Sequence, residues 1–597
     1  MSQVGPAAQY QGFTTFNKID GSTWTLTGTP AQATDWTISG GVLSVNGAMP
    51  SSTVAVNNGG TLGGNGSVGN TTVNAGGTLA PGNSIGLITI NGTLVMGAGA
   101  IYKVETSGAS ADKTVVTGNA GLNGTVSVNP LTRLTVRTTY TILSAASLSG
   151  TFGSAGFSAA NSLARNPVLT YSGGDVFLTL DPGLLSPNLP GVTTANQRSV
   201  AAGIDSGLQG GSLFTGFDPL FALSPAALPA ALDQLSGEVH ASTVSVLADE
   251  SLYARSAILG RLRQASYGDS TMGAMAALRI GGPQAFAGAD EINTALAYAK
   301  SPIVTKSPIV TKAPPMAPVP TSDIVFWAQG FGAWAKFNGD GNAASVSRNL
   351  AGFISGVDMR VGGNGRVGFA AGYTGSQNNT DGRGSANVDT GHVAAYGGLS
   401  FGALNLRGGA DYAFHTISTD RSIVFPGFFD RAFANYDGST AQIFGEAGYG
   451  FALANIALEP FAGGAWVRVH TDAGAERALL AGLNFASADF EVGYSTLGIR
   501  AASVVPLANG MVLIPRASAA WQHAFGSVAA TDVLAFQAAP ASPFTISGVP
   551  IARDAALLEA GLDLALNAHA TVGVSYTGQV ANNVADHAAK GKFSWKF

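Results

Sequence analysis

Residues 323–597 repeat an alternation of apolar with polar or small side chains, and this pattern limits the fold more than any other feature of the chain. It divides into twelve segments that start near residues 324, 349, 366, 388, 403, 438, 454, 489, 510, 553, 569 and 586. A period of two residues is typical of strands with two different faces. The pattern therefore predicts an all-β region of twelve antiparallel strands, and an even number suits a closed single-chain barrel.

The two faces of these predicted strands favour a membrane over a soluble core. The polar face carries full charges, as a water-filled lumen allows: Glu446, Arg500, Arg516, Glu559, Asp563 and Lys590. Aromatic residues gather near strand ends, where a bilayer interface would lie. The chain also ends inside a strand at Phe597, and an open apolar edge of this kind would invite aggregation. We therefore expect a C-terminal 12-stranded antiparallel transmembrane β-barrel surrounded by outer-membrane lipid.

The composition agrees with a chain that crosses a periplasm and enters the membrane as strands. Charged residues make up 11% of the chain, against roughly 25% in globular proteins, and mean hydropathy is +0.23. The net charge is −5 without a basic stripe, which argues against a nucleic-acid partner. Cysteine is absent, which excludes disulfides. The first residues, MSQVGPAAQYQGF, lack a leader pattern, so we expect a signal peptide upstream of this chain.

Residues 1–185 carry a second and different repeat. Short runs of β-forming residues, such as TWTLTGT, STVAVNNGGTLGGNG and LITINGTLVMGAG, each end in a Gly/Asn turn. Their spacing of about 15 to 20 residues is the coil length of a parallel β-helix, whose coils bury their apolar faces by stacking. We expect a right-handed parallel β-helix, closed by a C-terminal cap that begins at IYKVETSG.

Residues 186–322 are predicted to form a linker. Helical periodicity runs through ALPAALDQLSGEVHASTVSVLADESLYARSAILGRLRQA. Further along, SPIVTK occurs at 301–306 and again at 307–312, and a proline-rich stretch follows. Two segments remain candidates for crossing the barrel lumen, one around 237–265 and one around 288–322. About 20 helical or about 10 extended residues span a bilayer of about 30 Å, so length does not decide.

Several of these segments together resemble the monomeric autotransporters of Gram-negative bacteria, the type V secretion family. GGTLAPGNSIGLITINGTLVM and TILSA are similar to the passenger-associated repeat and its autochaperone-like end, and QLSGEVHAS is similar to the linker helix. FWAQGFGAWAKFNGDGNAAS resembles the start of the β-domain, and FSWKF resembles the C-terminal signature read by the barrel-assembly machinery, with Phe593, Trp595 and Phe597 as its aromatic residues. The passenger is shorter, and the linker longer and richer in proline, than the family pattern.

Motifs with chemical potential have simpler interpretations. Gly82-Asn83-Ser84-Ile85-Gly86 matches a nucleophile elbow, but a predicted strand follows it and residues 1–185 contain no histidine. The polar run 338–342 is interpreted as a turn after the first barrel strand rather than a calcium loop. The seven histidines show no metal-binding spacing: 240, 392, 415, 470, 523, 569 and 587. We therefore predict no catalytic, cofactor or metal site, and a protein that is not an enzyme.

The resemblance implies a function in protein secretion. The barrel would insert with periplasmic chaperones and the barrel-assembly machinery, and the linker would thread its lumen. The monomer would then display a β-helical passenger that acts in adhesion or virulence through a host surface ligand. Two alternatives remain: a carrier whose catalytic passenger is missing from an N-terminally truncated chain, and a porin-like channel.

Overall fold

The computed structural model describes residues 12–30, 33–191, 193–268, 324–453, 456–507 and 510–597. Contacts divide the chain into two compact units. One comprises Met1–Leu189 and Phe217–Ala226, and the other comprises Pro190–Gly216 and Ala227–Phe597. Within the described part of the chain, no helix is both long enough and apolar enough to cross a membrane.

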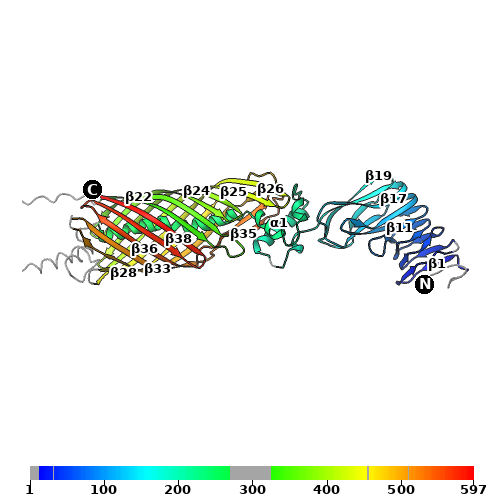
Figure 1. Ribbon diagram of the computed structural model, residues 1–597, viewed down its shortest axis with the longest axis horizontal. Helices are drawn as coiled ribbons and strands as arrows, with labels where there is room; N and C mark the ends of the chain where they lie inside the picture. The colour runs from blue at the N-terminus through cyan, green and yellow to red at the C-terminus, as the bar shows by residue number, and fades with distance from the viewer. Residues whose placement is uncertain (1–11, 31–32, 192, 269–323, 454–455, 508–509) are drawn as a thin grey trace, which may run out of the picture. The chain divides into compact units, whose positions relative to one another are not determined.

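The first unit is built from short strands (Figure 1). Its strands are β1 (Thr15–Lys18), β2 (Thr23–Leu26), β3 (Asp35–Ile38), β4 (Gly41–Val45), β5 (Ala48–Met49), β6 (Thr53–Val56), β7 (Gly60–Gly64), β8 (Ser67–Val68), β9 (Thr71–Val73), β10 (Thr78–Pro81), β11 (Leu87–Ile90), β12 (Leu94–Met96), β13 (Ile101–Ser107), β14 (Ser110–Ala111), β15 (Lys113–Leu122), β16 (Thr125–Pro130), β17 (Thr138–Gly150), β18 (Ser154–Phe157), β19 (Ala164–Ser172) and β20 (Asp175–Pro182). One sheet follows the order β1-β3-β6-β9-β12-β15, and the other follows β18-β16-β13-β10-β7-β4-β2. These neighbours pair in parallel, so the chain winds into stacked coils, as the repeat predicts.

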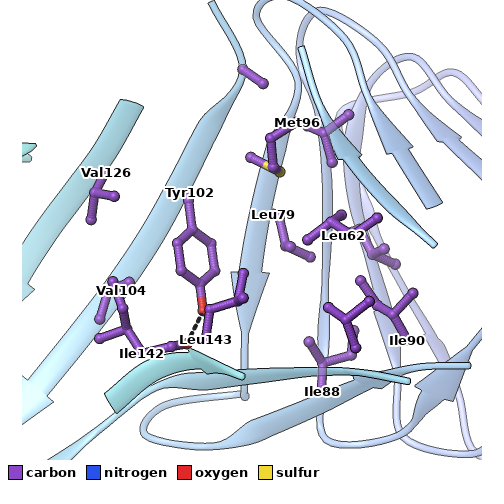
Figure 2. Packing of buried hydrophobic residues seen from close by; sticks show 14 of the residues in the cluster. Leu62, Leu79, Ile88, Ile90, Met96, Tyr102, Val104, Val126, Ile142 and Leu143 are labelled. Carbon is purple, nitrogen blue, oxygen red and sulfur yellow. Dashed lines mark hydrogen bonds between the residues drawn. The ribbon is translucent and has the colours of Figure 1, made fainter. Parts of the chain in front are cut away.

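Side chains at equivalent positions of successive coils stack into columns, and these columns form the core of this unit. Leu43 pairs in register with Leu62, Leu62 with Leu79, and Leu79 with Tyr102, and all four side chains are fully buried. Figure 2 shows Leu62, Leu79 and Tyr102 within this core. Because each coil leaves its apolar face open, the next coil must cover it. Beyond β15 the pairing changes, since β20 pairs antiparallel with both β17 and β19.

The second unit contains a closed barrel of twelve antiparallel strands, as the alternation predicts. These strands are β21 (Ile324–Phe337), β22 (Val346–Val361), β23 (Gly365–Thr380), β24 (Gly384–Phe401), β25 (Leu404–Phe425), β26 (Phe428–Tyr449), β28 (Ile456–Thr471), β31 (Ala488–Ser503), β33 (Val512–Phe525), β36 (Asp554–Ala565), β37 (Ala570–Val580) and β38 (Val584–Lys596). Each strand pairs with the next, and β38 pairs with β21 to close the sheet. Short strands β27 (Phe451–Leu453) and β32 (Val505–Pro506) extend the hairpins at one end.

The sixth strand corrects the predicted strand limits. β26 begins at Phe428, ten residues before the predicted start at 438, because the β25–β26 hairpin continues well past its neighbours. In the structure, Asp430 accepts backbone N–H groups of Leu479, Leu480 and Ala481 from a neighbouring loop.

Two long loops at the same end of the barrel form a further sheet that the sequence did not predict. Its strands are β29 (Gly474–Ala475), β30 (Leu483–Phe485), β34 (Thr531–Phe536) and β35 (Phe544–Ser547), paired in that order. The helical elements of the chain are η1 (Ser186–Asn188), α1 (Ala195–Gln209), α2 (Asp218–Ala222), α3 (Leu228–Leu235) and α4 (Glu238–Gly268).

Candidate functional site: a helix inside the barrel

Helix α4 occupies the interior of the barrel along most of its length (Figure 1). At its first residue, the Glu238 carboxylate accepts the backbone N–H of Ala344 in the loop after β21. Near its other end, Gln264 donates to Ser594, close to the C-terminus of the chain. A helix of 31 residues is about 46 Å long, more than a bilayer core of about 30 Å. The first lumen candidate, 237–265, is therefore the segment in the barrel; the second, 288–322, lies outside the described residues.

One side of α4 packs against apolar side chains of the first barrel strands. Buried helix residues Ala254, Ala257, Ile258 and Leu262 belong to one cluster with strand residues Trp327, Phe331, Leu350, Ile354 and Tyr396. Tyr253 stacks on Phe331 with ring centroids 5.4 Å apart. This contact fixes which face of the helix meets β21–β24.

Buried ion pairs hold the remaining faces of α4. Arg348 of β22 lies 3.1 Å from the Asp249 carboxylate of α4 and 2.6 Å from the Asp586 carboxylate of β38. Tyr253 donates its hydroxyl to Asp586 at 2.7 Å, and Gln579 donates to Asp249 at 3.2 Å. The helix and the strands β22, β37 and β38 thus share one hydrogen-bonded group.

A second group of charges lies further along the helix. Arg261 donates to both oxygens of Asp358, at 2.7 and 2.8 Å, and Arg366 also pairs with this carboxylate. Arg263 pairs with Glu446, which Arg407 and Arg500 also approach, at 3.0 and 2.8 Å. A guanidinium matches a carboxylate with two parallel hydrogen bonds, so these pairs orient the helix as well as hold it.

The structure places all six predicted lumen charges among these interior groups. Glu446 and Arg500 belong to the group around Arg263. Arg516 pairs with Glu559 and lies 3.3 Å from Asp563, whose carboxylate accepts Lys592 at 2.6 Å. Lys590 donates to Ser256 of α4 at 3.1 Å.

Sequence reasoning missed the partners of these charges. It did not single out Arg348, Asp358 or Asp586 on the strands, or Asp249 and Arg261 on the helix. A usable signal was present, because α4 carries charges on several faces and such a helix is unsuited to lipid but suited to a polar lumen.

The helix leaves a small space on one side. A cavity of about 120 Å³ lies beside Arg255, Ser256 and Leu259. Its far wall is lined by small residues of the strands, including Gly445, Gly463, Gly464, Thr496, Ser518 and Ala520. The occupied lumen therefore retains room for a few water molecules.

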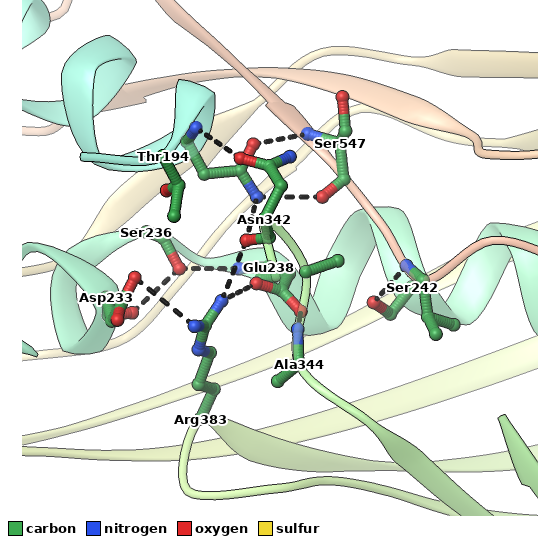
Figure 3. Close-up of polar contacts among 12 residues, drawn as sticks. Thr194, Asp233, Ser236, Glu238, Ser242, Asn342, Ala344, Arg383 and Ser547 are labelled. Carbon is green, nitrogen blue, oxygen red and sulfur yellow. Dashed lines mark hydrogen bonds and ion pairs between the residues drawn. The ribbon is translucent and has the colours of Figure 1, made fainter. Parts of the chain in front are cut away.

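A polar junction surrounds the N-terminal end of α4 (Figure 3). Arg383, in the turn after β23, pairs with Glu238 and lies 3.2 Å from Asp233 of α3. Asn196 of α1 exchanges two hydrogen bonds with the backbone of Ser547, both 2.9 Å. Ser242 accepts the N–H of Val549 at 3.0 Å. These contacts join α1, α3 and α4 to the loops of the barrel.

His240 connects the same helix end to the sheet formed by the long loops. Its ring nitrogens lie 3.1 Å from the Tyr436 hydroxyl and 2.9 Å from the Glu476 carboxylate. Arg421 donates twice to Glu476, at 2.7 Å each. Burial alone would raise the pKa of Glu476, but Arg421 and the His240 hydrogen bond lower this pKa to about 2. The carboxylate stays ionised and keeps its partners across the physiological pH range.

The nucleophile-elbow motif lies in a turn of the β-helix. Gly82 has a φ of +84°, Asn83 bonds to Ser44 and Asn46 of earlier coils, and Gly86 donates to Asp112. Strand β11 follows, where an elbow would require a helix. Ser84 is exposed, and the first histidine in the sequence is His240, in the other compact unit.

Comparisons with known proteins give one family match and several similar proteins. Residues 326–577 match the family model described as the autotransporter beta-domain. Two extracellular serine proteases of Serratia marcescens are 29% and 28% identical over 370 residues, which are 62% of this chain. The chain spans only 31% of the length of either relative. The translocator domain of the autotransporter NalP from Neisseria meningitidis is 16% identical, with a TM-score of 0.38, and covers 46% of this chain and 89% of its own.

These relatives correct one prediction. The sequence was expected to belong to a protein that is not an enzyme, and the similarity to two named proteases overturns that expectation.

Loss of Arg348 should destabilise the occupied barrel. In Arg348→Met, the carboxylates of Asp249 and Asp586 would remain buried without their cation, a loss of about 3–5 kcal/mol. We expect a clear drop in the temperature at which the folded barrel unfolds on a heat-modifiability gel. Arg468→Met is the matched control, because Arg468 and its partner Asp489 are each 47% exposed and such pairs contribute about 0–1 kcal/mol. Equal melting of both variants would show that the lumen pairs do not stabilise the barrel.

Proposed function

Since residues 326–577 belong to the autotransporter β-domain family, we propose that this barrel exports the N-terminal part of its own chain across the outer membrane. The observation that carries the proposal is α4, which lies in the lumen and directly connects exported residues to the barrel. The family match supports an outer-membrane location and a role in translocation.

The two ends of the barrel differ in a way that gives export a direction. At the end that holds the C-terminus, short connections such as 362–364, 402–403 and 566–569 join the strands. At the other end, the connections 472–487 and 526–553 are long. Bacterial barrels place short turns in the periplasm and long loops outside the cell. The N-terminal end of α4 lies at the long-loop end, so the chain before residue 238 leaves the barrel on the outer side.

The porin-like alternative has little support from the lumen. Helix α4 and its ion pairs run through the interior, and one cavity beside the helix measures about 120 Å³. An occupied barrel of this kind should conduct ions poorly.

Protease treatment of intact cells tests the export proposal. Residues before about 190 should be removed, and the barrel from residue 324 onward should resist digestion. A periplasmic marker protein must stay intact in the same sample to show that the outer membrane is closed. Protection of the N-terminal residues in intact cells, with digestion only after lysis, would contradict export.

We propose further that the complete protein carries serine protease activity in its exported part, as its curated relatives do. Within the described part of the β-helix there is no histidine to accompany Ser84, so the catalytic residues would lie in a segment that precedes these coils. Adhesion through a host ligand, and a monomeric state, stay predictions.

A serine-directed fluorophosphonate probe tests the protease proposal. The complete gene product, made in its own bacterium, should react at a serine outside residues 12–182. Ser84→Ala should leave that reaction unchanged. A complete product that does not react, or one that reacts only at Ser84, would contradict the proposal.

We also propose that Phe593, Trp595 and Phe597 act in assembly more than in stability. Their side chains are 38%, 39% and 60% exposed on the outer face of the last strand. The backbone N–H of Phe597 donates to Ile324, the first residue of the first strand, at 3.1 Å. In the closed barrel, the Phe597 backbone thus contacts the first strand while its aromatic ring stays largely exposed.

Replacement of the last residue should separate assembly from stability. Phe597→Ala should strongly reduce the amount of folded barrel in the outer membrane, while the fraction that folds melts at nearly the wild-type temperature. Phe353→Ala is the control, because this side chain is also outward-facing and 51% exposed but lies within β22. Equal outer-membrane levels of Phe597→Ala and wild type would remove the proposed role of Phe597.

A further inference from the structure

Four asparagines of the β-helix begin an Asn-x-Ser/Thr triplet. The triplets are Asn65-Gly66-Ser67, Asn70-Thr71-Thr72, Asn91-Gly92-Thr93 and Asn123-Gly124-Thr125. In exported proteins, this pattern is the acceptor for a sugar on the asparagine amide nitrogen, and it requires a surface position. The function proposed above does not use these residues.

Each of these asparagines lies at a corner of a coil, immediately or shortly before a strand. Asn70 directly precedes β9, and Asn65, Asn91 and Asn123 precede β8, β12 and β16. Asn65, Asn70 and Asn123 are exposed, and Asn91 is half-exposed. The corners thus present the asparagine side chains to solvent.

Three of the triplets have glycine at their middle position, and the close packing of successive coils explains this choice of residue. A Cβ at Gly66 would lie 2.0 Å from the carbonyl oxygen of Gly47, and one at Gly124 would lie 2.5 Å from that of Ala100. Only glycine fits where the backbone of one corner lies on the corner below. The close backbone contact faces inward, and the neighbouring asparagine side chain is left outside.

The amide hydrogen bonds of the β-helix separate these asparagines from others. Asn57, Asn74, Asn83, Asn119 and Asn129 donate their Nδ2 groups along the stack, to Ser39, Asn57, Asn46, Ser147 and Glu105. None of these five donors begins a triplet.

The four triplet asparagines behave differently. Among the described residues, none of their Nδ2 groups donates a hydrogen bond. Where their side chains bond at all, the carbonyl oxygen accepts: Asn65 from Leu87 N–H at 3.2 Å, and Asn70 from Thr93 N–H at 2.8 Å. A substituent on Nδ2 would therefore cost no hydrogen bond of the fold.

We propose that Asn65, Asn70, Asn91 and Asn123 are N-glycosylation sites. In the reaction, Nδ2 forms a bond to the anomeric carbon of a sugar whose activating group is a diphosphate. The bond from that carbon to the diphosphate oxygen breaks, the diphosphate leaves with the electron pair, and one amide proton passes to a base of the transferase. The product keeps the Oδ1 acceptor and one N–H, so the corner hydrogen bonds of Asn65 and Asn70 persist.

Asn123 lies in a triplet whose two recognised side chains, those of Asn123 and Thr125, are both exposed and make no hydrogen bonds within the described structure. A transferase can therefore reach the amide and the hydroxyl together. A sugar at these corners would also add hydrophilic cover to a chain in which only 11% of residues are charged.

The chain offers three matched comparisons. Asn58 is exposed and donates no hydrogen bond within the described structure, but it lacks the hydroxyl residue two positions later. Asn74 donates its amide to Asn57 at 2.8 Å. Asn378 begins the triplet Asn378-Asn379-Thr380 but is 1% exposed inside the barrel. Asn58 and Asn74 both test the need for the hydroxyl, since neither begins a triplet, and Asn378 tests the need for exposure.

Peptide mass spectrometry of the full chain, purified from the outer membrane of the bacterium that makes it, tests the proposal. Sugar mass should be found at the four proposed asparagines and be absent at Asn58, Asn74 and Asn378. Asn123→Gln and Thr125→Ala should each remove one increment, and Thr125→Ser should retain it. Export and heat-modifiability of each variant are measured alongside to confirm folding. Unmodified peptides at all four sites, or equal modification of Asn58, would overturn the proposal.

The source of the sugar can be distinguished in the same cells. When export across the inner membrane is blocked, modified protein in the cytoplasm identifies a nucleoside diphosphate sugar as the donor. Modification that occurs only after that crossing identifies a lipid-linked diphosphate donor.

Discussion

The pairing of β21 with β38 joins residues 325–337 to residues 584–596 and closes the sheet. In a bilayer no water is available to satisfy an open strand edge, so every backbone N–H and C=O of the spanning strands must find a partner in the sheet. Closure has a geometric consequence, because alternate side chains must then point into a lumen. The charges of that lumen require partners, and α4 supplies many of them. The helix and its ion pairs therefore depend on a sheet that leaves no edge.

The barrel was predictable because its signal is local. Alternation along each strand identified the twelve strands and placed Glu446, Arg500, Arg516, Glu559, Asp563 and Lys590 on the polar face without knowledge of their neighbours. The start of β26 was wrong because the part of this strand before residue 438 is defined by its pairing with β25, which the sequence does not display. The sheet of β29, β30, β34 and β35 was missed for a related reason. Its strands are two to six residues long and pair between loops that lie some 50 residues apart in the chain.

The sequence also did not predict which side chains pair with one another inside the lumen. Nothing in the spacing of Asp249, Arg348 and Asp586 shows that they meet, since they lie on a helix and two distant strands. The prediction about enzymatic activity failed for a different reason. The motif search covered only the residues of this chain, whereas the 370 residues that match the protease relatives make up only 31% of either relative. A search limited to one part of such a protein does not report on the rest.

Because Asp249 lies in the linker helix, the lumen charges would find their partners on this helix only late in the proposed export. In the export that we propose, everything before residue 238 leaves the barrel before Asp249, Arg261 and Arg263 lie beside Arg348, Asp358 and Glu446. Until then, the lumen carboxylates and guanidinium groups would face water and an exported segment that has few charged residues. The arrival of the linker would be the first moment at which these groups all find partners. Transport would then stop by itself at a defined residue, and a completed passage would close the path behind it.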